Sequence, residues 1–251
     1  MGRWGDGMRR IAALGACLFA FTALAVAASA SAAEPAFYEC AKVKGGSFED
    51  KKCTKEAGTV KGEKYELLQG IRKAKAFKGK GGAIRLYAAA INAPIPCTGS
   101  KDEGKLSSPT TVEGLVVTFT GCSTMFRPCT SAGAKRGEVR TAPLDGQLGA
   151  ISEGVPGLLA ASRGTIASMA CEGLSVTLSG GFIGEITGDV NTMSKSFTLT
   201  YSETEGGEPA VTKFEGGETE VLESLFDGSG PFVTSLRGEI TNKTEELEVK
   251  A

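Results

Sequence analysis

The sequence predicts an all-β fold: a disulfide-stapled antiparallel β-sandwich or barrel-like domain with little or no helix. Three observations lead to this prediction. Apolar side chains alternate with hydroxyl side chains along several segments, glycine accounts for 35 of 251 residues, and six cysteines follow an N-terminal leader. Strands with one apolar and one hydroxyl face are typical of antiparallel sheets, because the strands of parallel sheets are covered on both faces. The glycines supply the turns that such a fold needs.

Residues 1–33 have the features of a secretory signal peptide. Basic side chains within residues 1–10 precede an apolar run over 11–28, and the small residues of ASASAAEP offer a cleavage site near Ala33. Cleavage there leaves residues 34–251 as a single extracellular domain. An uncleaved anchor is the alternative. No second apolar run of that length follows, so we expect no membrane span once the signal has been removed.

The mature chain carries opposite charges in two regions. Residues 37–85 hold 13 basic and 6 acidic side chains, whereas residues 203–248 hold 3 basic and 12 acidic ones. These regions should attract each other or different partners.

The absence of histidine excludes several classes of site. Without imidazole the chain cannot use Ser-His or Cys-His nucleophile activation, nor imidazole-ligated zinc or iron. Neither Ser-x-x-Lys nor Gly-x-Ser-x-Gly occurs. The single tryptophan, Trp4, lies in the leader, so a sugar-stacking platform would have to use Phe or Tyr. We therefore expect a protein without cofactor, metal or catalytic residues.

The cysteines of the mature chain predict three disulfides, because an even number in an exported chain is typical of a disulfide framework. They are Cys40, Cys53, Cys97, Cys122, Cys129 and Cys171. A four-cysteine zinc site would need closely spaced pairs, which the chain lacks. We pair Cys40 with Cys53 by strand register and Cys122 with Cys129 by proximity. Cys97 and Cys171 then form the third bridge.

The register behind the first pairing assumes a two-residue turn at Gly46-Ser47. The strands on either side then place Cys40 opposite Cys53 and form a stapled hairpin with one basic face. The same register sets Lys42 against Lys51, which is a mildly destabilising like-charge pair.

Several further segments show strand-like alternation. The clearest are 115–120, 174–179 and 197–201. Other strand candidates are 63–69, 83–90, 137–142, 147–151, 164–169, 182–187, 211–215 and 231–237. TEVLESLF at 219–226 is the best helix candidate, but it also fits the first arm of a hairpin that turns at Asp227-Gly228, and we prefer the hairpin.

Two motifs with apparent chemistry are better explained as turns or loops. GSKDEGK at 99–105 fits the start of a phosphate-binding loop, but Leu106 lacks the hydroxyl that magnesium needs, so we expect a polar surface loop. Asp189 and Asn191 have the oxygen spacing of a calcium loop without its glycine and closing glutamate. We expect a turn between strands there.

Carboxylates are the remaining groups for catalysis. Glu113, Glu172, Glu185 and Asp189 lie near predicted strand ends. A secreted carbohydrate-active enzyme would need two of them at a fixed separation, with burial raising the pKa of one. This enzyme is our alternative function.

The chain resembles a group of exported, uncharacterised proteins of soil actinobacteria. The segments that carry the resemblance are FYECAKV, KKCT, SSPTTVEGLVVTFTGC, CTSAG, TGDVNTMSKSFTLTY and KFEGG. The resemblance implies a location in the cell envelope or outside the cell. It implies no activity, ligand or catalytic residue.

We therefore expect an exported domain of the cell envelope or the extracellular space that acts by binding or by coating a surface. The predicted binding residues are Lys42, Lys44, Lys51, Lys52 and Lys55, which lie within one short basic segment. Such a cluster attracts polyanions, and the polyanions nearest an exported protein are envelope polymers rather than nucleic acid. The alternative is that these lysines dock on the acidic region 203–248 or are only solvated.

Overall fold

The structure is a computed structural model that describes residues 34–58, 64–125 and 127–251. The predicted leader, 1–33, lies outside the described residues. The described chain is an antiparallel all-β domain, as predicted, and its only helical element is the 3-10 turn η1 (Ala89–Ile91). No described helix has the length and apolar character to span a membrane.

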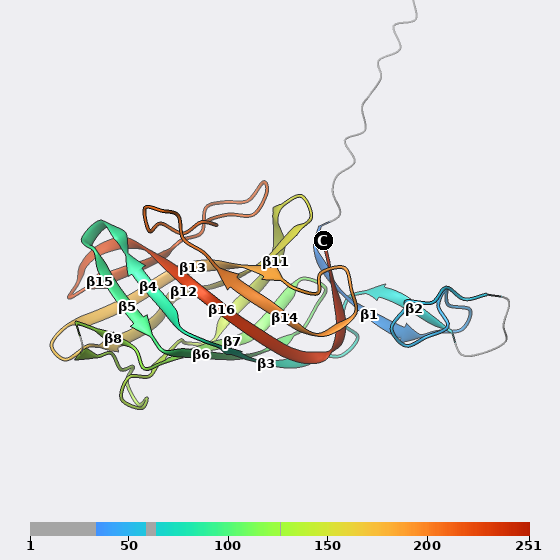
Figure 1. Cartoon of the computed structure of the whole chain (residues 1–251), viewed down its shortest axis with the longest axis horizontal. Helices are drawn as coiled ribbons and strands as arrows, with labels where there is room; N and C mark the ends of the chain where they lie inside the picture. Colours follow the sequence, from blue (N-terminus) through green and yellow to red (C-terminus); the bar gives the residue numbers. More distant parts are fainter. Residues whose placement is uncertain (1–33, 59–63, 126) are drawn as a thin grey trace, which may run out of the picture. The chain divides into compact units, whose positions relative to one another are not determined.

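Eight antiparallel strands close into a ring, which is the barrel-like form of the predicted fold (Figure 1). Around the ring they are β3 (Lys75–Gly81), β6 (Gly99–Leu106), β7 (Thr111–Thr120), β11 (Leu144–Ser152), β12 (Val155–Ala170), β13 (Ser175–Thr187), β14 (Ser194–Tyr201) and β16 (Ser229–Lys250). The ring closes because β16 pairs with β14 on one side and with β3 on the other.

Alternation along these strands builds the core inside the ring. Phe77, Leu106, Leu115, Leu199 and Ile240 are at most 2% exposed. Each contributes about 2 kcal/mol through burial of its apolar surface. Most residues between them on the same strands point outward and are polar, as the period of two predicts, and the apolar Val116 of β7 is an exception.

Six of the remaining described strands join the sheet of the ring, and the other two, β8 and β9, form a separate two-stranded sheet. The remaining strands are β1 (Ala36–Lys42), β2 (Tyr65–Gln69), β4 (Ile84–Ala88), β5 (Ala93–Cys97), β8 (Ser123–Thr124), β9 (Arg127–Pro128), β10 (Val139–Arg140) and β15 (Leu222–Phe226). β16 connects three of them to the ring, since it also pairs with β1, β4 and β15 (Figure 1). The predicted hairpin at Asp227-Gly228 is confirmed, because it joins β15 to β16.

The N-terminal segment confirms one predicted disulfide and corrects the predicted register. Cys40 and Cys53 are bonded. However, β1 pairs with β2, so Lys42 lies opposite Tyr65 rather than Lys51. The reason is a turn that the side chain of Asp50 closes, because its carboxylate accepts the N–H groups of Thr54 and Lys55, both at 2.9 Å. Cys53 sits in that turn and reaches β1 without forming a strand.

The other two predicted bridges are wrong. The structure bonds Cys97 to Cys122 and Cys129 to Cys171. Proximity along the chain misleads here because Cys122 and Cys129 flank the short β8-β9 hairpin, while Cys97 at the end of β5 comes beside the end of β7.

Two local predictions are also corrected. The segment 99–105, expected as a surface loop, is almost the whole of β6 in the wall of the ring. The segment 211–215, expected as a strand, forms none. It belongs to a connection in which Phe214 covers Gly149 of β11, and the N–H of Glu215 donates to the carbonyl of Ala150 at 2.8 Å. The turn expected at Asp189 and Asn191 is confirmed.

Candidate functional site

The outer face of the ring carries two rows of mostly polar side chains that follow the strand register. The first row crosses six strands and contains Thr198, Thr241, Lys80, Lys101, Thr118 and Arg140. The second row contains Ser196, Lys243, Lys78, Glu103 and Val116. Outward residues on one strand repeat every second position, so the rows lie about 7 Å apart.

The middle of these rows lines a hollow of about 560 Å³, which we call the basic hollow. Its cationic side chains are Lys78, Lys80, Lys101, Arg140 and Lys243, and its outward acids are Glu103 and Glu138. Lys78 and Glu103 form an exposed ion pair at 3.8 Å. The hollow therefore keeps an excess of positive charge, and its volume is within the range typical of ligand sites.

The floor of the basic hollow contains two pairs of lysines, and the two lysines of each pair lie opposite each other on neighbouring strands. Lys80 lies directly opposite Lys101, and Lys78 lies directly opposite Lys243. Side chains at such positions have Cβ atoms only about 5 Å apart, and equal charges there destabilise the sheet. An anion that bridges both ammonium groups would remove this repulsion.

The inner side of the same floor holds an unpaired polar group. Asp102 is 4% exposed and Asn242 is fully buried, and both are in register with Gly79. Neither carboxylate oxygen of Asp102 has a hydrogen-bond partner among the described residues. Burial raises the pKa of Asp102 to about 7, and the neighbouring Asn242 amide and Gly79 N–H offset only part of that effect.

A second hollow, of about 800 Å³, adjoins the first on the same outer face, and we call it the hydroxyl hollow. Glu239 lines it, and Thr241, the next outward residue of β16, lines the basic hollow. The polar side chains of the hydroxyl hollow are those of Thr200, Ser202, Glu203, Thr204, Glu205, Arg237 and Glu239.

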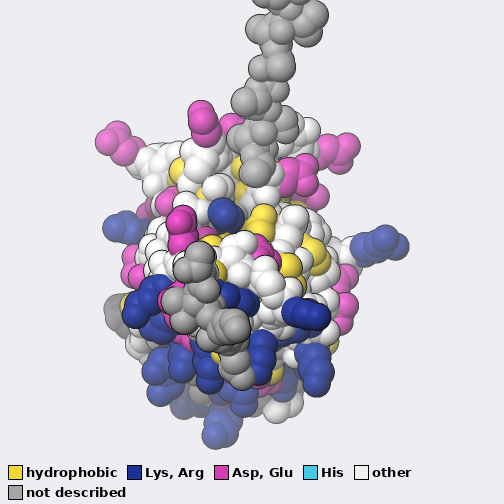
Figure 2. Space-filling view, turned by 90° about the vertical axis from the view of Figure 1, so that its right-hand side faces the viewer, with side chains coloured by type: hydrophobic (Ala, Val, Ile, Leu, Met, Phe, Trp, Pro, Cys, Tyr) yellow, Lys and Arg dark blue, Asp and Glu magenta, His cyan; other side chains and the backbone are white. Residues whose placement is uncertain are grey.

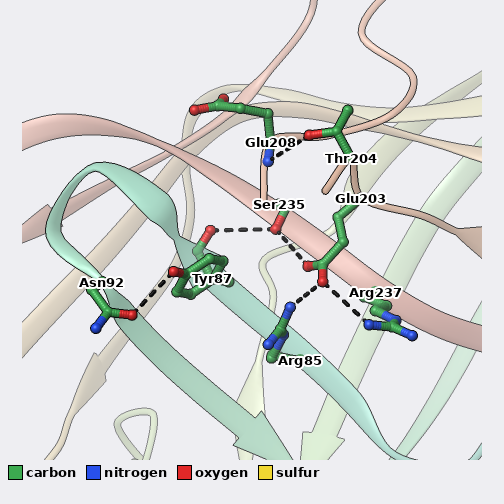
Figure 3. Close-up of polar contacts among 8 residues, drawn as sticks. All are labelled: Arg85, Tyr87, Asn92, Glu203, Thr204, Glu208, Ser235 and Arg237. Carbon is green, nitrogen blue, oxygen red and sulfur yellow. Dashed lines mark hydrogen bonds and ion pairs between the residues drawn. The ribbon is translucent and has the colours of Figure 1, made fainter. Parts of the chain in front are cut away.

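Glu203 organises one wall of the hydroxyl hollow (Figure 3). Its side chain is 8% exposed, and its carboxylate accepts hydrogen bonds from Arg85, from Arg237 at 3.4 Å and from the Ser235 hydroxyl at 3.2 Å. Both arginines come from neighbouring strands, β4 and β16, which pair at these residues. Arg237 makes one ion pair, with Glu203, and its side chain remains 66% exposed at the hollow.

The lysines predicted from sequence lie at one end of the domain. Lys42, Lys44, Lys51, Lys52 and Lys55 are all exposed. One of them, Lys52, contacts Glu246 of β16 at 3.8 Å, so part of the alternative docking on the acidic region is present. Figure 2 looks onto this end and shows Lys and Arg side chains gathered over its lower half, with many of the acidic side chains above.

The four carboxylates considered for catalysis are not brought together by any described contact. The Glu172 carboxylate pairs with Arg136 at 2.8 Å, and that of Asp189 accepts a hydrogen bond from Ser194 at 2.8 Å. The described hydrogen bonds and ion pairs include none from the side chains of Glu113 and Glu185.

The comparisons with protein-family models, curated proteins and solved structures found no match. The resemblance to exported actinobacterial proteins therefore stays a prediction.

Proposed function

We propose that the protein is an exported cell-envelope protein that binds an anionic polymer through the basic hollow. The observation that carries the proposal is the register of the two lysine pairs, Lys80 with Lys101 and Lys78 with Lys243. A sheet gains nothing from ammonium groups held opposite each other, whereas a ligand with negative charges gains a preformed site.

The extracellular part of the proposal is supported by the disulfides. Three bridges among the described residues are typical of proteins outside the reducing cytosol. The polyanions of that environment are envelope polymers, whose repeated charges can occupy several lysines at once. Arg140, at the end of the first row, extends the cationic surface beyond the lysine pairs.

The test is a charge reversal on the floor of the hollow. We expect Lys80→Glu, Lys101→Glu to reduce the affinity for isolated anionic envelope polymer by at least tenfold at physiological salt. In the parent protein, affinity should fall steeply as salt rises, because exposed charges are screened beyond about 8 Å at that ionic strength. Isothermal titration at several salt concentrations measures both effects.

Two control variants separate this site from other basic surfaces. Lys73→Glu, Lys213→Glu changes the net charge by the same amount at exposed positions outside both hollows and should bind as the parent does. Lys42→Glu, Lys44→Glu, Lys51→Glu tests the N-terminal lysines. If this triple variant loses binding while the Lys80 and Lys101 variant keeps it, the basic hollow is not the site.

A further inference from the structure

The hydroxyl hollow and the basic hollow are neighbours along β16 and offer two different chemistries. Along β16 the outward residues run from Arg237 and Glu239 in the hydroxyl hollow to Thr241 and Lys243 in the basic hollow. Along β14, Thr200 lines the hydroxyl hollow. Thr198 lies opposite Thr241, which lines the basic hollow. A ligand longer than one hollow would meet both.

The groups of the hydroxyl hollow suit uncharged hydroxyls rather than anions. Two carboxylates, Glu205 and Glu239, are exposed acceptors without a hydrogen bond or ion pair among the described contacts. They would repel phosphate or sulfate, but they accept hydrogen bonds from hydroxyl groups. Ser202 can donate or accept, and Arg237 keeps N–H groups free beyond the one that Glu203 holds.

Among the described residues, none that lines the hydroxyl hollow offers an exposed ring on which a sugar could stack. Its one aromatic lining residue, Tyr201, is 5% exposed. The nearby Tyr87 ring is covered by Gly207, and its hydroxyl hydrogen-bonds to Asn92 at 3.0 Å (Figure 3). Hydrogen bonding without stacking favours an open-chain polyol over a pyranose ring.

From these observations we infer that the ligand is a polyol phosphate polymer: its phosphodiester groups bind in the basic hollow, and the hydroxyls of an adjacent polyol unit bind in the hydroxyl hollow. Ser202, Glu239 and Arg237 contact those hydroxyls, and Glu203 acts as a positioning residue that fixes Arg237. This inference rests on the proposed function, since it assigns the class of polymer that the basic hollow holds.

The experiment compares two polymers with equal numbers of phosphates. Poly(ribitol phosphate) carries free vicinal hydroxyls, and linear inorganic polyphosphate carries none. We expect the protein to bind poly(ribitol phosphate) about tenfold more tightly, which corresponds to the net gain of one or two hydrogen bonds. Isothermal titration at one fixed salt concentration gives both affinities.

A double variant should affect the two probes differently. Ser202→Ala, Glu239→Leu removes two hydroxyl partners and one negative charge. Affinity for poly(ribitol phosphate) should fall about tenfold, whereas affinity for polyphosphate should stay level or rise. The matched control, Ser229→Ala, Glu218→Leu, makes the same changes at exposed positions outside both hollows and should leave the affinity for each polymer unchanged.

The outcomes separate the two proposals. Equal affinity of the parent protein for both polymers, or equal responses of both to the double variant, overturns the polyol assignment and leaves anion binding intact. If neither polymer binds in a salt-dependent way, the proposed function fails, and the polyol assignment fails with it.

Discussion

Replacing Asp102 with asparagine should stabilise the protein at alkaline pH and leave it nearly unchanged in acid. The pKa of this carboxyl rises from an ordinary value of 3.8 to about 7, because burial removes its water and the neighbouring Asn242 amide and Gly79 N–H offset only part of that loss. In the native state the group therefore holds its proton over a range of pH in which the unfolded chain has already lost it.

The sign of the pH dependence follows from that difference. Between about pH 4 and pH 7 the native state binds more protons than the unfolded state, so the free energy of unfolding falls as the pH rises. A shift of about three pKa units, at 1.36 kcal/mol for each unit, corresponds to about 4 kcal/mol. The parent should lose about this amount across the range and then level off above pH 7.

Denaturant unfolding of the parent protein and of Asp102→Asn, measured at half-unit steps from pH 4 to pH 8.5, tests this reasoning. Every other titrating group is common to both proteins, so the difference between the two curves isolates Asp102. We expect a difference near zero at pH 4 that grows to about 4 kcal/mol in favour of the variant at pH 8. A difference that does not change with pH would refute the assignment of an orphaned buried carboxyl.

Three further predictions concern the packing, the buried ion pair and the bridges. Gly79→Ala should destabilise the protein by about 1–3 kcal/mol, because its Cβ would overlap the side chains of Asp102 and Asn242. Gly164→Ala, which has open space, serves as the control in the same denaturant melts. Lys75→Met should cost about 3 kcal/mol at pH 7, because it leaves Glu39, 9% exposed, without the ammonium at 2.8 Å. Burial alone would raise the pKa of Glu39, but hydrogen bonds from Lys75 and Arg72 outweigh it and lower that pKa, so the effect should fade as the pH falls below about 4.5. Cys129→Ser, Cys171→Ser should destabilise the protein by about 0.5 kcal/mol more than Cys97→Ser, Cys122→Ser, since its loop spans 42 rather than 25 residues. Thermal melts measure the difference in stability, and non-reducing peptide maps identify the bonded cysteines. A map with Cys122 bonded to Cys129 would contradict the pairing.

The sequence predicted the fold class because alternation is a local property that each strand displays by itself. In β13 and β14 apolar residues alternate with polar ones over most of the strand, and the hairpin at Asp227 carries its own turn residues. The pairing of distant cysteines has no such local signal. Which strand ends meet depends on the order of strands around the ring, so the neighbour along the chain was the wrong partner for Cys122.

The basic hollow was missed for a related physical reason. In β6 the inward positions are Ser100, Asp102, Gly104 and Leu106, so most of the strand lacks the apolar alternation that identifies a wall segment. The outward Lys101 was consequently attributed to a loop. Lys78 and Lys80 alternate with Phe77 and Gly79, and this alternation was the sequence signal that the two lysines lie on the outer face of a strand. Their position opposite other lysines became visible only from the register of three separate strands, β3, β6 and β16.

The role of β16 as the closing strand also bears on how the chain folds. This strand follows all the others in sequence and pairs with five of them. Until it inserts, β14 and β3 each present an unpaired edge of N–H and C=O groups to other chains. Folding dominated by such distant pairings is slow, on the order of milliseconds to seconds. The period before insertion is therefore when the protein is most exposed to aggregation, and a binding partner that covered those edges would act as its chaperone.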